Sequence, residues 1–256
     1  MARVFEKDEK VFDCWIENKN RDGVWLSLPA NSDELQEAYK QLEVTSTNEI
    51  KVEDYNFYTK EGVGLVFHEG LDLDELNYFA HRMLELDKND IHKDYNSADI
   101  FYELMNEMQV TSIKKCIDYA DNDVINKLNV YTNVKNEEDI GYLYAELNQI
   151  NIPENCKCYF DFETYGRDVS SDIGCYIGEF GYIEYSDACP EIDYKGKESI
   201  PDELLITPEA IAERTKARSL ELSDTAMNEL NELINKKECD KQRVDIVALN
   251  KRSKGR

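Results

Sequence analysis

The fold class follows from the stretch Val11-Phe-Asp-Cys-Trp-Ile16, the turn-forming residues 18–23, and Val24-Trp-Leu-Ser-Leu28. Both apolar runs are short, contain β-branched and aromatic residues, and are bounded by turn formers, which is typical of neighbouring strands. A third apolar run, Ile50 to Tyr55, has the same character. These three runs predict a small sheet at the start of the chain.

A helix is predicted between the second and third runs. Pro29 ends the second strand, and Asn31 followed three residues later by Glu34 is typical of a helix start. Apolar residues then recur at helical spacing at positions 35, 38, 39 and 42. The sheet and this helix together form an α+β unit.

The middle of the chain is predicted to be helical. Apolar residues recur at helical spacing from Leu73 to Leu84 and from Ile100 to Met108. Short helices are expected at 113–119 and 124–128. A further amphipathic helix begins at Glu137 and runs toward Pro153.

A second α+β unit is expected after that helix, with strands at Cys158–Phe162, Cys175–Ile177 and Tyr182–Tyr185. Lys-rich helical segments follow at 208–218 and 223–237. We therefore expect an α+β protein made of about three small subdomains. The expected division is 1–60, 61–129, 130–189 with the second sheet, and a helical, basic-ended extension at 190–256.

The charge of the chain restricts its partners. It has 54 acidic and 30 basic residues and a formal net charge of −24 at pH 7. Residues 236–256 hold 8 Lys/Arg and 3 Asp/Glu, which leaves 22 basic and 51 acidic residues, a net of −29, in the rest. Such a body repels nucleic acid and anionic membranes, so a basic partner is expected. Duplex DNA carries one charge per roughly 1.7 Å, so this charge matches that of about 15 base pairs.

The cysteines indicate the compartment. Seven of them are scattered, and the sequence contains no signal peptide and no long apolar run. A soluble, reduced protein of the cytoplasm is expected.

Carboxylates recur in every segment of the acidic body. Like charges that repeat along one helix face cost about 0.2–0.5 kcal/mol per adjacent pair, which suggests a purpose other than folding. A merely solubilising surface is the competing interpretation. The candidate acidic surface consists of Asp33, Glu34, Glu37, Asp72, Asp74, Glu75, Glu85, Asp87, Asp90, Asp94, Asp99, Glu103, Glu107, Glu137, Glu138 and Asp139.

Enzymatic motifs are weak. Asp161-Phe-Glu163 at a predicted strand end is similar to the first metal-binding motif of DEDD-type exonucleases, where carboxylates hold Mg²⁺. Such enzymes need further carboxylates downstream, and only one credible pair is found. Cys156-Lys-Cys158 is too closely spaced for a standard zinc half-site. No catalytic residue, metal or cofactor is therefore expected.

The sequence around this pair also resembles the ArdA-type antirestriction proteins. The resemblance is clearest in Tyr159-Phe-Asp-Phe-Glu-Thr-Tyr-Gly-Arg-Asp-Val169 and in Gly181-Tyr-Ile-Glu-Tyr185, and it extends over roughly residues 11–186. Within it, Asp161, Tyr165, Gly166, Arg167 and Asp168 form the family signature. A structural role for this signature is slightly favoured over contact with the target.

The resemblance implies an elongated chain of small subdomains that forms a non-enzymatic, cofactor-free homodimer. Its carboxylates would imitate DNA phosphates and block the DNA groove of type I restriction-modification enzymes. Two alternatives stay open. One is a general acidic module that binds another basic protein, and the other is the Mg²⁺-dependent exonuclease that would use Asp161 and Glu163. Residues 190–256 have no counterpart in shorter members, and their role is open.

Overall fold

The computed structural model describes residues 9–68, 70–88, 95–171, 173–185 and 194–220. The chain divides into two compact units, Met1–Pro208 and Glu209–Arg256. The first unit extends beyond the boundary at residue 189 that was predicted from the sequence. In the second unit, residues 209–220 are helical, as predicted. The predicted helix at 223–237 lies outside the described residues.

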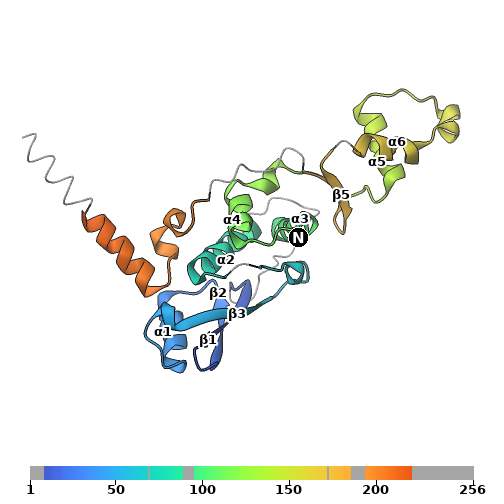
Figure 1. Cartoon of the computed structure of the whole chain (residues 1–256). Coiled ribbons are helices and arrows are strands. Elements are labelled where there is room, and N and C mark those ends of the chain that lie inside the picture. The colour runs from blue at the N-terminus through green and yellow to red at the C-terminus, as the bar shows by residue number, and fades with distance from the viewer. Residues whose placement is uncertain (1–8, 69, 89–94, 172, 186–193, 221–256) are drawn as a thin grey trace, which may run out of the picture. The chain divides into compact units, whose positions relative to one another are not determined.

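The first sheet and its helix confirm the predicted opening unit. Strands β1 (Phe12–Asn18), β2 (Gly23–Leu28) and β3 (Ile50–Phe57) form an antiparallel sheet in the order β2-β1-β3, with α1 (Ser32–Gln41) beside β2 (Figure 1). A short 3-10 helix, η1 (Thr47–Glu49), precedes β3.

Along β1, fully buried and half-buried residues alternate from Phe12 to Ile16. Phe12, Cys14 and Ile16 are fully buried, whereas the residues between them are only half-buried. Aromatic rings continue the core from the sheet into the helices, because Phe12 lies 4.8 Å from Phe57 and 6.4 Å from Phe79 between ring centroids.

The central helices are α2 (Leu73–Lys88), α3 (Ser97–Glu107) and α4 (Ile113–Asp121). Helix α2 packs against both α3 and α4, so its side chains are buried on several sides. The 3-10 helices of this region are η2 (Gly62–Gly64) and η3 (Val124–Lys127).

The second sheet has the order β4-β6-β5, with β4 (Asn129–Tyr131), β5 (Cys175–Gly178) and β6 (Gly181–Glu184), all antiparallel. Helices α5 (Glu137–Leu147) and α6 (Phe162–Ser170) pack side by side (Figure 1). The α+β class is therefore confirmed. Strands β5 and β6 were predicted, whereas the three-residue strand β4 was not.

The predicted strand Cys158–Phe162 is wrong. Residues Glu154–Tyr159 form the 3-10 helix η4, and Asp161 instead caps α6, which begins at Phe162. The reason is local, because the Asp161 carboxylate accepts hydrogen bonds from the backbone N–H of Thr164 (3.0 Å) and from its hydroxyl (2.8 Å). This is a helix N-cap, and it overrides the strand preference of the aromatic residues.

Two short 3-10 helices, η5 (Lys197–Ser199) and η6 (Asp202–Leu204), follow the second sheet along the chain. Residues 200 and 205–207 beside them are buried. Within the described part of the chain, none of the helices combines the length and the apolar character that a membrane span requires.

Candidate interaction surface

The candidate carboxylates fall into three groups in the structure. Some are exposed and can meet a partner, some are half-buried, and some are buried; two lie outside the described residues. The exposed ones are Asp33, Glu34, Glu37, Glu85, Glu107 and Glu138; the half-buried ones are Asp72, Asp99, Glu103, Glu137 and Asp139; the buried ones are Asp74, Glu75 and Asp87; Asp90 and Asp94 are not described.

Helix α1 presents its carboxylates on a well-defined helix start. The Asn31 side chain accepts the N–H of Glu34, and the Glu34 carboxylate accepts the N–H of Asn31, which completes the predicted capping box. Burial raises the pKa of Glu34, but hydrogen bonds from Lys10 and Asn31 and the Lys10 charge outweigh it and hold that pKa below its usual value. Glu34 is therefore tied down, whereas Asp33 extends from the same turn into solvent.

The start of α2 corrects part of the predicted surface. Asp74 is 0% exposed and Glu75 is 4% exposed, so neither can face a partner in this fold. Asp72 caps the helix by accepting the N–H groups of both residues. Hydrogen-bond donors from residues 194–207 hold this cluster inside the protein, and the sequence gives no local sign of them.

Asp87, at the other end of α2, is also buried. Its carboxylate accepts the side-chain N–H of Asn96 at 2.8 Å. Asn96 in turn caps α3 by accepting the N–H of Ala98. Asp87 therefore orients a helix cap, and it too is removed from the candidate surface.

Asp99, Glu103 and Glu107, spaced four residues apart on α3, were all expected on the candidate acidic surface. Instead, Glu103 accepts the backbone N–H of Glu179 at 2.6 Å, in the turn between β5 and β6. Burial raises the pKa of Glu103 despite this hydrogen bond. Of the three, only Glu107 is exposed, and the other two are half-buried.

The start of α5 combines capping with exposure. Asn136 caps the helix by accepting the N–H of Asp139, and the Asp139 carboxylate accepts the N–H of Lys135. Three carboxylates in the first turn match the positive end of the helix dipole. Of the three, Glu138 is the exposed one.

The signature residues Asp161 to Asp168 have mostly internal contacts. The Arg167 guanidinium bonds to the carboxylate of Glu137 at 2.5 Å and to that of Glu163 at 3.0 Å. The Tyr165 hydroxyl accepts the side-chain N–H of Asn148 at 3.0 Å. The signature thus connects α5 to α6.

Gly166 allows α5 and α6 to approach each other closely because it has no side chain. A Cβ at Gly166 would lie 1.9 Å from the carbonyl oxygen of Glu137, and a Cβ at Gly141 would lie 1.9 Å from that of Phe162. Both values are far below van der Waals contact, so the crossing requires glycine on both helices. The Tyr142 and Phe162 rings stack beside it, 3.8 Å apart between centroids.

Asp168 differs from the other signature residues. Its side chain is exposed, and no hydrogen bond or ion pair to it is found within the part of the chain that the structure describes. It is the signature residue best placed to meet another molecule.

The Asp161 and Glu163 pair does not have the strand-end geometry of an exonuclease. Asp161 caps α6, and the hydrogen bonds from Thr164 lower its pKa. Glu163 bonds to Arg167. Among the described residues, no group of three or more His, Cys, Asp or Glu side chains is arranged to hold a metal ion.

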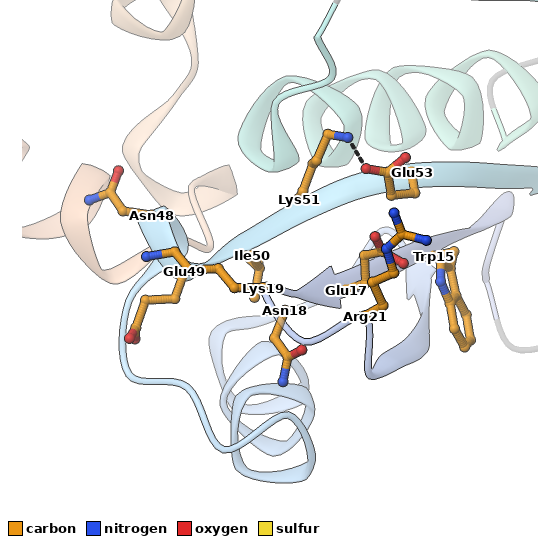
Figure 2. Close-up of a pocket in the computed structure, with 10 residues that line it drawn as sticks. All are labelled: Trp15, Glu17, Asn18, Lys19, Arg21, Asn48, Glu49, Ile50, Lys51 and Glu53. Carbon is orange, nitrogen blue, oxygen red and sulfur yellow. Dashed lines mark hydrogen bonds and ion pairs between the residues drawn. The ribbon is translucent and has the colours of Figure 1, made fainter.

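A hollow of about 770 Å³ lies at one end of the first sheet. Figure 2 shows the side chains that line it, among them Lys19, Arg21, Glu17 and Trp15, together with an ion pair between Lys51 and Glu53. Its cations and carboxylates are mixed, which does not define a ligand class. The sequence analysis did not predict this hollow, because its residues come from separate turns and strands.

Comparison with known proteins identifies the family of the chain. The family model described as "Antirestriction protein (ArdA)" matches residues 17–184, which is more than half of the chain and includes the second sheet and all of the first except most of β1. No match was found among curated proteins. The chain belongs to the ArdA family of antirestriction proteins.

Proposed function

We propose that this protein inhibits type I restriction-modification enzymes by imitating the charge of duplex DNA and occupying their DNA-binding groove. It acts as a homodimer in the cytoplasm, by binding alone, with no catalytic step and no cofactor. The observation that carries the proposal is the set of exposed carboxylates on α1, α3 and α5 within a matched antirestriction region of a chain with net charge −24.

Several of these carboxylates are available for a partner. The exposed side chains of Asp33, Glu107 and Glu138 have no hydrogen bond or ion pair within the described residues. The same holds for Glu146 at the end of α5 and for Asp168 in the signature. Because these groups stand on packed helices, binding a partner would cost little ordering of the backbone.

The physical basis is competition for the same cations. A DNA groove is lined by Lys and Arg side chains that neutralise phosphates and fix the position of the duplex without reading its bases. A folded surface of carboxylates can engage these side chains in the same way. An inhibitor of this kind would act on enzymes of different sequence specificity.

The proposal requires that binding depends on many carboxylates together. We would measure the affinity of the full-length protein for a type I methyltransferase core over a series of salt concentrations. The test variant combines Asp33→Asn, Glu107→Gln, Glu138→Gln, Glu146→Gln and Asp168→Asn. The matched control replaces exposed uncharged residues instead, with Gln36→Ala, Gln41→Ala and Asn133→Ala.

The test variant should bind more weakly, and its salt dependence should flatten by up to roughly one unit of log–log slope per lost contact. The control and each single carboxylate variant should change the affinity less than about threefold. Wild-type affinity in the five-residue variant would reject DNA mimicry through this surface. Binding of equal strength to unrelated basic proteins would favour a general acidic module.

A further inference from the structure

Residues 194–207, which we term the clasp, lie beyond the family-matched region and pack onto it. Ile200, Leu205, Ile206 and Thr207 are at most 5% exposed. The 3-10 helix η6 within the clasp packs against α2. The clasp is therefore part of the first unit, although it falls within the extension at 190–256 that was expected from the sequence.

The anchor of the clasp is the buried carboxylate of Asp74. It accepts the backbone N–H groups of Ile206 (2.9 Å) and Thr207 (3.0 Å) through Oδ1, and the Thr207 hydroxyl (2.5 Å) through Oδ2. The Lys197 ammonium lies 3.4 Å from the same Oδ2. All four donors belong to the clasp, and a fully buried carboxylate without such donors would be strongly unfavourable.

Asn77, one turn further along α2, makes a second connection. Its side-chain N–H donates to the carbonyl oxygen of Leu204 (3.0 Å), and its side-chain oxygen accepts the N–H of Ala30 (2.7 Å). Asn77 is fully buried. Through this one side chain the clasp is joined to the chain that follows β2.

Tyr194 and Lys197 extend the contact over the acidic start of α2. The N–H of Tyr194 donates to Asp118 of α4 at 3.2 Å, and its hydroxyl donates to Glu75 at 3.4 Å. Lys197 pairs with Asp72 at 2.5 Å. The clasp thus satisfies carboxylates from two central helices.

We propose that the clasp is an obligatory part of the acidic body: it is anchored to α2 at Asp74 and joined to α4 at Asp118. Asp74 and Glu75 then serve folding rather than partner binding. The acidic start of α2 is then a receptor for the chain's own C-terminal segment. This inference does not depend on DNA mimicry, because it concerns contacts inside one chain.

The amide hydrogens of Ile206 and Thr207 report on the clasp directly. In the full-length wild-type protein we expect the peptide that covers 203–208 to exchange at least roughly 100-fold more slowly than an unstructured chain. Exchange at the unstructured rate would overturn the proposal. This measurement needs no variant, so a folding failure cannot obscure it.

Two variants then test the anchor. Asp74→Asn keeps an oxygen that can accept the backbone N–H groups but removes the charge opposite Lys197, and Thr207→Val removes only the hydroxyl donor. Each should speed exchange of the 203–208 peptide by about tenfold or more and leave peptides from α5 unchanged. The matched control, Asp33→Asn, changes an exposed carboxylate and should leave the clasp peptide unchanged.

The double variant separates the contact from general destabilisation. If Asp74 and Thr207 act through one interaction, the combined effect on exchange should be clearly smaller than the product of the single effects. Multiplicative effects, or unchanged exchange in both single variants, would contradict an anchor at Asp74. Partner binding per folded molecule should be the same in Asp74→Asn as in the wild type.

Discussion

Replacing Gly166 by alanine tests whether the family signature is structural. Gly166 lies where α6 crosses α5, opposite Gly141 and the carbonyl oxygen of Glu137. An added Cβ would lie 1.9 Å from that oxygen and 2.7 Å from the Gly141 nitrogen. Neither neighbour is the end of a flexible side chain, so the helices themselves have to move.

The expected loss of stability follows from that movement. Ordinary contact begins near 3.4 Å, so the helices must separate by about 1.5 Å to relieve the contact. Overpacking of this kind costs about 1–3 kcal/mol, and the size of the shift places it near 3 kcal/mol. Alanine also favours the helix over glycine by about 1 kcal/mol, which offsets part of this cost. The net loss is about 2 kcal/mol, or roughly 4–8 °C in Tm for a unit of this size.

Thermal unfolding followed by circular dichroism measures this loss, and hydrogen exchange of the α5 and α6 peptides locates it. Gly70→Ala is the matched control, because no atom lies within 4 Å of a Cβ at Gly70. A Gly166→Ala protein with unchanged or raised Tm would refute the close helix crossing. Lower affinity for a target with unchanged Tm would instead assign the glycine to the partner contact.

Three further predictions concern single sites. Burial raises the pKa of Glu75 above 4.5, so the folded state binds its proton more tightly than the unfolded chain does, and stability falls as pH rises through the raised pKa. In thermal melts, Glu75→Gln should therefore have a higher Tm than the wild type at pH 7, and the difference should disappear below about pH 4.5. A lower Tm of the variant at pH 7 would contradict this prediction. Burial raises the pKa of Cys14 to about 12 and also raises the pKa of Cys116. A thiol reagent should therefore label the exposed Cys156 and Cys158 in the native protein, and label Cys14 and Cys116 only after unfolding, as mass spectrometry of the labelled peptides would show. Asn31→Ala removes the cap of α1 and should cost about 1 kcal/mol in urea unfolding, whereas a loss below a few tenths would discount the capping box.

The sequence predicted the structure correctly where the interactions that form an element lie within a few residues of one another. The capping box at Asn31 and Glu34 is closed within four residues, and the alternation in β1 reports directly on one buried face. The strand predicted at Cys158–Phe162 failed because the Asp161 side chain caps α6 and starts a helix at Phe162, which outweighs the strand preference of the aromatic residues. Tyr159 is 87% exposed, whereas Phe162 is buried against Tyr142 of another helix.

The candidate surface was harder to predict, because a sequence counts charges without showing where their hydrogen-bond donors lie. The donors to Asp74 come from residues 132 and 133 positions further along the chain. The N–H that reaches Glu103 comes from a turn 76 positions away. Excess charge was therefore visible from composition, but the division into surface and structural carboxylates requires the fold.

The most direct test of DNA mimicry is displacement of DNA. A labelled cognate duplex is bound to a type I methyltransferase core and titrated with the full-length protein at constant salt. DNA mimicry predicts complete release of the duplex as the protein saturates the enzyme, with no complex that contains both. A stable complex of enzyme, DNA and this protein, or an undisturbed enzyme–DNA complex, would contradict it.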